Sequence, residues 1–505
     1  MKNVFQKYWL LLFLAITLGL FSLYQYPNIL LKRPYGIHIW RQTIGLSITQ
    51  KFKENNQSVF EPEIHNLLAD NHSSGKGAGE FPVLYKIASW FPNIEISLKV
   101  IHFLLFYLGI FFLYKLFLFW SGQNVFMSLS AVVLFLSSPT IVYYALNYLP
   151  DAAALGLSLG GTYFLITGIY QRQQIKLLIG VVFFLFTGLL KVTHLIPMLA
   201  FIPMWWSNRR VFSGKQQIWF LASTGLALIT IAGWYIYAEY FNQIHGGRYT
   251  VNAIHPIWSA DWEHIKGVIT QFFQWTNHQL YLFPFSVVFV GFFFAKSLDL
   301  KIFKFFLFSG VVIYILLWFT VFDHHDYYML PFYLLLAIGI FEFVRRMFCN
   351  KKLIVLLMVT IVLNVLYANE NIRMRYNIAS NDITQRILPL SDVRGFQYMN
   401  WDFKQKWEVF TRKEVIAHFL NKNGADSSRT IYVPFDESPT VSLYFLNRNG
   451  FTGFSKLTEK EVYRLQIPFV LIRSNTQKQY SFLKNYLPAD SLGNLVLYRF
   501  KTLHH

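Results

Sequence analysis

The sequence predicts a polytopic α-helical membrane protein with about eleven transmembrane helices and a C-terminal extracytoplasmic α/β domain. Its 505 residues are 54% hydrophobic and only 14% charged, and the mean hydropathy is +0.36, which is not the composition of a soluble chain. Apolar runs of spanning length recur along residues 1–370. After residue 370 the apolar runs shorten to strand length, which indicates a change of domain.

The first predicted span is 8–24, behind Lys2 and Lys7. A signal peptide would have this pattern too, but no small-residue cleavage site follows, so we interpret the run as a retained helix. The other predicted spans are 97–120, 125–145, 152–170, 177–190, 193–206, 216–237, 281–296, 302–322, 328–345 and 353–369.

Lys and Arg gather in every second connection, and such connections face the cytoplasm. These stretches are the N-terminus, 171–176, 207–215, 296–304 and 345–352. The opposite face then receives 26–96, 147–151, 191–194, 238–280, 323–328 and everything from 371 onward. We therefore predict a multi-pass membrane protein with its C-terminal domain and nearly all of its unusual polar residues on the extracytoplasmic side.

The domains predicted are 1–370, which spans the membrane and includes the long outer loop 26–96, and 371–505, a soluble α/β domain. In the second of these a helix-like stretch at 413–423 ends at Gly424. The runs predicted as strands are 431–434, 442–445, 469–472 and 495–500.

The composition also excludes several classes of function. The net charge of +19 comes from basic residues at the ends of apolar runs, so it marks topology and no nucleic-acid partner is predicted. Cys349 is the chain's one cysteine, which excludes an internal disulfide and a cysteine-based metal site. The phosphate-loop, dinucleotide and zinc-protease motifs do not occur. We predict no cofactor and no metal.

The densest polar motif lies in the first outer loop, at 36–42. His38, Trp40, Arg41 and Gln42 would supply a proton acceptor, a stacking surface and hydrogen-bond donors at the depth of a lipid headgroup. We predict that Trp40, Arg41 and Gln42 bind substrate. The alternative is that Trp40 and Arg41 only anchor the chain at the membrane interface.

Two further outer turns carry charged residues. Asp151 opens a predicted helix, where it either contributes to the reaction or caps the helix. Lys191 and His194 lie among apolar residues, and a lysine at that depth needs an anionic partner such as a phosphate, unless its amine reaches the outer interface. We predict that both bind substrate.

A late corner at 323–328 contains two histidines and two carboxylates. Neighbouring side chains in one turn rarely converge on a single ion, so we predict that His324, His325 and Tyr328 hydrogen-bond to a polar substrate instead of holding a metal.

Taken in order, these motifs resemble the GT-C superfamily of polytopic glycosyltransferases, and in particular the protein O-mannosyltransferases and the lipid A aminoarabinose transferases. The resemblance covers about residues 8–370. It is carried by the outer-loop motif His38–Gln42, the segment 79–85, Asp151, Lys191, and the corner His325, Tyr328 and Pro331.

The resemblance implies a polyisoprenyl-phosphate sugar as donor and an extracytoplasmic acceptor, which is a saccharide, a lipid or a protein. It also implies a base for the acceptor hydroxyl, and relatives place an acidic residue three positions before the motif arginine. Here that position holds His38. Three explanations stay open: His38 is the base, Glu80 or Asp151 has taken over, or the protein is catalytically impaired.

We therefore predict a GT-C glycosyltransferase with Glu80, Asp151 and His38 as candidate catalytic residues. The alternatives are a non-catalytic binder or transporter of lipid-linked saccharide, and a ligase or polymerase acting on carrier-linked glycan. A transporter would need polar residues at mid-bilayer depth and repeat symmetry between halves, and the sequence has neither.

Overall fold

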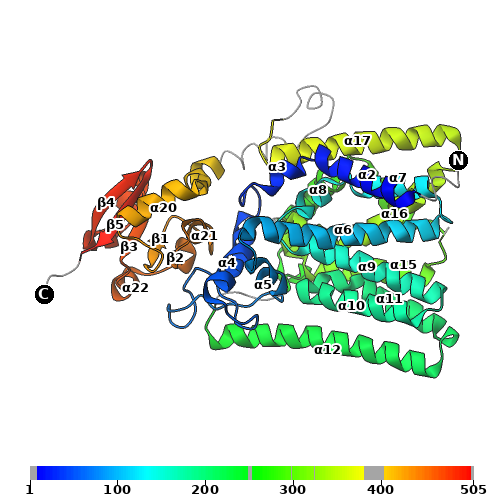
Figure 1. Ribbon diagram of the computed structural model, residues 1–505, viewed down its shortest axis with the longest axis horizontal. Helices are drawn as coiled ribbons and strands as arrows, with labels where there is room; N and C mark the ends of the chain where they lie inside the picture. The colour runs from blue at the N-terminus through cyan, green and yellow to red at the C-terminus, as the bar shows by residue number, and fades with distance from the viewer. Residues whose placement is uncertain (1–7, 248–252, 297, 324, 380–402, 502–505) are drawn as a thin grey trace. The chain divides into compact units, whose positions relative to one another are not determined.

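The computed structural model describes residues 8–247, 253–296, 298–323, 325–379 and 403–501, and it divides into two compact units. The first unit is Met1–Lys32, Lys99–Trp234 and Asn252–Gln397. The second is Arg33–Leu98, Tyr235–Val251 and Tyr398–His505. Each predicted apolar run of the first 370 residues contains helix, although the run 281–296 is helical only at Phe285–Phe293 (Figure 1).

The helices in chain order up to residue 375 are α2 (Trp9–Leu23), α3 (Tyr26–Leu30), α4 (Ile39–Asn55), α5 (Val83–Ser89), α6 (Ile94–Trp120), α7 (Val125–Phe135), α8 (Pro139–Ala145), α9 (Asp151–Tyr170), α10 (Gln174–Leu190), α11 (Ile196–Asn208), α12 (Gly214–Ile244), α13 (Trp262–Trp275), α14 (Phe285–Phe293), α15 (Lys301–Leu317), α16 (Tyr333–Met347) and α17 (Lys351–Arg375). Short 3₁₀ turns include η1 (Val192–Leu195), η5 (Phe319–Asp323) and η6 (Asp326–Phe332).

Among the described residues, five helical segments are long and apolar enough to cross a membrane, and the protein is an integral membrane protein. A sixth candidate is the pair α7 and α8, which bends by 81° at a break that Pro139 follows. Helices such as α2 and α10 have 15 and 17 residues, which is short for a span. The count of about eleven spans therefore stays a prediction.

Small residues let the helices of the first unit approach closely. Gly109 of α6 and Gly156 of α9 face each other, and a Cβ built on either glycine would lie within 2.5 Å of the other helix's backbone. Such contacts are typical of membrane helices, where close van der Waals packing replaces the hydrophobic effect. Figure 1 shows α9, α10 and α11 side by side in this bundle.

The second unit contains a five-stranded sheet of order β2-β1-β3-β5-β4. The strand β1 (Ile431–Val433) pairs in parallel with β2 (Gly450–Thr452) and β3 (Phe469–Arg473). The strands β4 (Tyr486–Leu492) and β5 (Leu495–Phe500) add antiparallel. The inner strands β1 and β3 are almost wholly buried, whereas the edge strand β4 is mostly exposed and carries a proline, which an edge tolerates.

Helix α20 (Lys413–Lys422) and three of the four strands confirm the sequence prediction for this region, but the strand predicted at 442–445 is wrong. Those residues form α21 (Val441–Leu446). The hydroxyl of Ser438 accepts the backbone N–H of Val441, and the carboxylate of Asp436 accepts that of Ser442. These two bonds satisfy the first amides of a helix, so capping outweighs the strand preference of a short apolar run. Helix α22 (Glu459–Arg464) follows.

The long outer loop folds with this sheet. The amide of Gly450 donates to the carbonyl of His65, and the amide of Leu67 donates to the carbonyl of Gly450, so residues 65–67 add a short parallel bridge beside β2. Helices α4 and α5 belong to the same unit. The sequence predicts 371–505 as a domain of its own, whereas the structure groups 398–505 with 33–98 and 235–251.

Membrane topology gives the first testable prediction. Cys349 is exposed and follows Arg345 and Arg346, so the wild-type chain should react with a membrane-impermeant thiol reagent only from the cytoplasmic side. In a Cys349→Ser background, cysteine at the exposed positions of Glu61 or Lys460 should react only from outside. Labelling of position 61 from the cytoplasm alone would invert the predicted orientation. His65 is unsuitable for this assay because it is only 1% exposed.

Candidate functional site

The motif of the first loop opens α4, and its arginine is paired with the carboxylate that sequence analysis singled out. Arg41 donates to Glu80, and the hydroxyl of Tyr85 donates to the same carboxylate oxygen at 2.6 Å. Gly45, one turn after Arg41, leaves room for the ring of Tyr85, because a Cβ at position 45 would lie 2.9 Å from that ring. The structure thus joins 36–42 with 79–85 in one charge-neutralised cluster.

The other residues of this motif differ in their surroundings. His38 precedes α4 with φ of 58°, a left-handed backbone that few residues other than glycine adopt. Trp40 is 45% exposed and is available for stacking or for the interface. Gln42 is buried, and its amide bonds to the carbonyls of Tyr35 and Ile37, which closes the turn before the helix. Its predicted contact with substrate stays a prediction.

In the first unit the structure brings together Asp151 and Lys191, which are 40 residues apart in the sequence. Asp151 is the first residue of α9, and Lys191 links the end of α10 to η1. The lysine amine lies 3.5 Å from Oδ1 of Asp151, and their side chains are 16% and 2% exposed. Oδ2 of Asp151 is buried and has no hydrogen-bond partner among the described residues.

Two tyrosine rings from the late corner border the same lysine. The amine of Lys191 lies 5.6 Å from the ring centroid of Tyr327 and 5.6 Å from that of Tyr328, within the range of cation–π attraction. The ring of His325 is tilted against both tyrosine rings, with centroids 5.3 and 5.9 Å away. The predicted corner therefore meets the predicted lysine, and Tyr327 is a residue that sequence reasoning missed. His324 lies outside the described residues.

His194 lies in η1, three residues after Lys191, and is 1% exposed. Its carbonyl accepts a hydrogen bond from the hydroxyl of Ser158 on α9, at 3.1 Å. Nε2 of the ring has no hydrogen-bond partner among the described residues. An unmet buried polar atom near the lysine cation is a feature that a polar ligand or water would satisfy.

A buried ion pair holds the late corner, and the sequence analysis did not find it. Arg375, at the end of α17, donates to Asp326 at 3.2 Å, and both side chains are at most 2% exposed. Tyr144 of α8 donates to the other oxygen of Asp326. Because Asp326 is the first residue of η6, these contacts fix the turn that carries Tyr327 and Tyr328. An arginine at the end of an apolar helix was the available signal.

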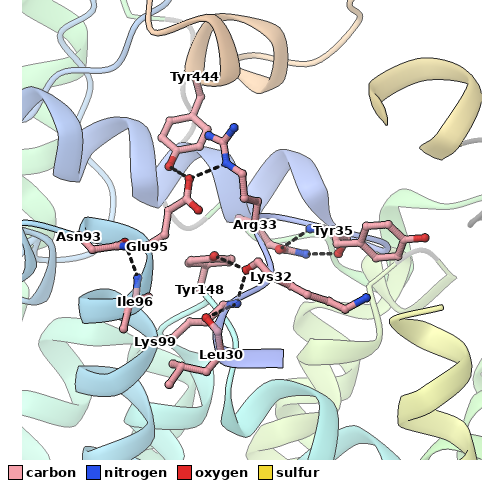
Figure 2. Close-up of polar contacts among 11 residues, drawn as sticks. Leu30, Lys32, Arg33, Tyr35, Asn93, Glu95, Ile96, Lys99, Tyr148 and Tyr444 are labelled. Carbon is pink, nitrogen blue, oxygen red and sulfur yellow. Dashed lines mark hydrogen bonds and ion pairs between the residues drawn. The ribbon is translucent and has the colours of Figure 1, made fainter. Parts of the chain in front are cut away.

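The exit from α3 towards the first loop is held by a second buried cation of the first unit. Lys99 of α6 is 1% exposed, and its amine donates to the carbonyl of Ile29 at 2.8 Å. It also donates to the carbonyl of Lys32 at 2.6 Å, as Figure 2 shows. The hydroxyl of Tyr148 donates to the same Lys32 carbonyl at 3.0 Å. A lysine that is bonded to backbone carbonyls in this way has a structural role.

Among the residues described, no group of three or more His, Cys, Asp and Glu side chains is arranged to hold a metal ion. That a metal plays no part in the reaction stays a prediction. The chemistry available in the described clusters is a lysine cation, a carboxylate beside it, and aromatic hydroxyls and rings, which is a set that binds an anion and moves a proton.

His65 gives a prediction for pH dependence. Burial, with the nearby Lys51 as a second cause and Glu54 opposing them, lowers the pKa of His65 from 6.5 to about 3. The unfolded chain binds a proton at this residue below about pH 6.5, whereas the folded chain does not until about pH 3. Stability should therefore fall as the pH drops through this window, by at most about 1.4 kcal/mol per pH unit.

Thermal unfolding of the wild type and of His65→Gln, each at pH 7 and pH 5, measures this dependence. The wild type should lose more stability between the two pH values than the variant does. Equal losses in both proteins would show that the buried imidazole is not the responsible group.

Similarity to known proteins is found in the structure and not in the sequence. No family model matches the sequence, and no curated protein does. Solved structures do match over the whole length. A crystal structure of ArnT from Cupriavidus metallidurans bound to undecaprenyl phosphate has a TM-score of 0.57, and the apo form of the same protein has a TM-score of 0.60. In both cases the identity is 14% and the alignment covers 97% of this chain and 97% of the other. The chain therefore shares the fold of ArnT, which confirms the fold that the resemblance of its motifs predicts.

Proposed function

We propose that the protein is a membrane glycosyltransferase that moves a sugar from a polyisoprenyl-phosphate donor to an extracytoplasmic acceptor, which is a glycan, a lipid or a protein. The observation that carries this proposal is the cluster of Lys191, Asp151, Tyr327 and Tyr328. A fold shared along 97% of the chain with ArnT bound to undecaprenyl phosphate supports it.

In the proposed reaction the acceptor hydroxyl attacks the anomeric carbon of the sugar. The new carbon–oxygen bond forms as the bond between the anomeric carbon and the phosphate oxygen breaks, and the polyisoprenyl phosphate leaves with the bonding electrons. The proton of the hydroxyl passes to a base. The enzyme must therefore supply a cation for the leaving phosphate and an acceptor for one proton.

We assign the first task to Lys191. Its amine is partly buried, and a cation in such surroundings binds a phosphate more strongly than one in water. The rings of Tyr327 and Tyr328 keep the amine in place, and Tyr328 has a hydroxyl that can donate to a phosphate oxygen.

For the base, the structural surroundings favour Asp151 over Glu80. Glu80 already accepts hydrogen bonds from Arg41 and Tyr85, and a proton taken up there would weaken both. One oxygen of Asp151 has no hydrogen-bond partner among the described residues. His38 stays the third candidate, next to Trp40 and Arg41, which we assign to orienting the sugar.

Native mass spectrometry of the purified protein with undecaprenyl phosphate tests the donor part of the proposal. The proposal predicts a one-to-one complex of the protein with undecaprenyl phosphate. This complex should form at a concentration at which inorganic phosphate does not bind. A protein that binds neither undecaprenyl phosphate nor its sugar adducts would contradict the proposal, and a protein that binds a donor sugar without ever turning it over would be a non-catalytic binder.

A further inference from the structure

The two ends of the first loop are joined to each other and to the C-terminal segment by one set of polar contacts. Arg33 starts the loop, Glu95 ends it, and their side chains form an ion pair at 3.0 Å although they are 62 residues apart. The hydroxyl of Tyr444, on α21, donates to the same carboxylate oxygen at 2.7 Å. Figure 2 shows the carboxylate of Glu95 between the guanidinium of Arg33 and the Tyr444 hydroxyl.

The arginine of this set also stacks on α21. Its guanidinium carbon lies 4.7 Å from the ring centroid of Phe445 and 5.9 Å from that of Tyr444. The side chains of Arg33 and Glu95 are only 20% and 19% exposed, so the pair is shielded from water and depends on Tyr444 for part of its solvation.

A second contact joins the C-terminal segment to the motif helix itself. The hydroxyls of Thr43 on α4 and Thr440 before α21 are hydrogen-bonded at 3.0 Å, and neither residue is exposed at all. Thr43 lies two residues after Arg41, which pairs with Glu80. The bond between Thr43 and Thr440 therefore ties the beginning of α4, which also carries Arg41, to the C-terminal segment.

A third contact joins the middle of the loop to the sheet. Asn66, which is fully buried, donates to the carbonyl of Pro439 at 2.7 Å and to the hydroxyl of Thr452 at 3.2 Å, and it accepts from the hydroxyl of Ser455 at 3.1 Å. Every polar atom of this amide side chain is thus bonded to the C-terminal segment. Without that segment the side-chain amide nitrogen and oxygen of Asn66 would stay buried and lose these hydrogen bonds, which is unfavourable.

We propose that the segment 439–455 is a positioning element of the first loop, with Tyr444 and Thr440 as the residues through which it holds α4, Arg41 and Glu80 in place. The effect on catalysis rests on the proposed function, whereas the effect on the order of α4 does not.

Hydrogen exchange followed by mass spectrometry tests the proposal on the full-length protein. In the double variant Tyr444→Phe, Thr440→Val, which keeps the ring and the side-chain volume, the amides of α4 (Ile39–Asn55) should exchange about tenfold faster than in the wild type. The amides of β3 (Phe469–Arg473) should exchange as before, because the sheet does not use these hydroxyls. The single variant Thr440→Ser, which retains the hydroxyl, should protect the amides of α4 as the wild type does.

The matched control is Tyr463→Phe, which removes a hydroxyl from an exposed tyrosine of the same region, and it should leave α4 unchanged. Unchanged protection of α4 in the double variant would overturn the proposal, and so would an equal loss in β3, which would mean that the sheet merely unfolds. In a transfer assay the double variant should lower kcat and leave the binding of undecaprenyl phosphate unchanged. A wild type without transfer activity would refute the proposed function alone, since the exchange result stands independently.

Discussion

Replacing Lys191 by alanine is expected to weaken the binding of undecaprenyl phosphate by about 100-fold or more, because it removes the one partly buried amine of the Asp151 cluster. Charge-assisted hydrogen bonds of this type contribute about 1.5–3 kcal/mol each. The loss of affinity should be equally large for undecaprenyl phosphate and for a sugar-loaded donor. Titration of the protein in lipid nanodiscs with undecaprenyl phosphate measures it.

Two control variants make this result specific. Lys191→Arg keeps a cation and should retain most of the binding. Lys215→Ala removes an exposed lysine of a predicted cytoplasmic stretch and should have no effect. If a folded Lys191→Ala protein binds undecaprenyl phosphate as the wild type does, Lys191 does not bind the donor. Its amine then only extends to the outer membrane interface.

Replacing the catalytic base should reduce the turnover rate by about 10²–10⁴-fold while donor binding persists, because general-base catalysis contributes that much. We expect this result for Asp151→Asn, whose amide keeps the shape of the side chain but does not accept a proton. The comparison is with Glu80→Gln and His38→Ala, assayed for transfer after folding is verified. Near-wild-type transfer from all three variants would mean that the base lies elsewhere.

The pattern of losses separates two roles for Glu80. If Glu80 is the base, Glu80→Gln should lower the turnover rate more than Asp151→Asn does. As a partner of Arg41 and Tyr85, it would give the smaller loss of turnover and leave the binding of undecaprenyl phosphate unchanged, because only the motif helix would shift. We expect the second outcome.

Much of the helical part of the fold was predictable because apolar runs have a physical length. The runs at 97–120 and 353–369 correspond to α6 (Ile94–Trp120) and α17 (Lys351–Arg375), since the sequence alone fixes which stretches avoid water. The boundaries moved outward because helices continue into polar residues, as α17 does to Arg375.

Side-chain pairing across the chain was predictable only where a charge lay in an apolar context. Lys191 and the Asp151 that begins α9 could be singled out for this reason, and the structure joins them. The pair of Asp326 with Arg375 was missed, because Asp326 was interpreted as one member of a polar corner and its partner lies 49 residues further along.

No local sequence pattern predicts the contacts among Arg33, Glu95 and Tyr444 either. Its members come from the two ends of one loop and from the C-terminal segment, and periodicity does not report which distant residues meet. The helix α21 was misassigned because a four-residue apolar run has no distinguishable period, and the capping residues Asp436 and Ser438 were the decisive signal.

The most direct test of the central claim compares the glycolipids and surface glycans of cells that carry the wild-type gene with those of cells that carry Asp151→Asn at equal protein abundance. Mass spectrometry should find one glycolipid or glycan species that lacks a single sugar residue in the variant, together with accumulation of the sugar-loaded polyisoprenyl phosphate. Identical masses and an unchanged level of the loaded carrier in both strains would contradict the proposal that this protein transfers a sugar.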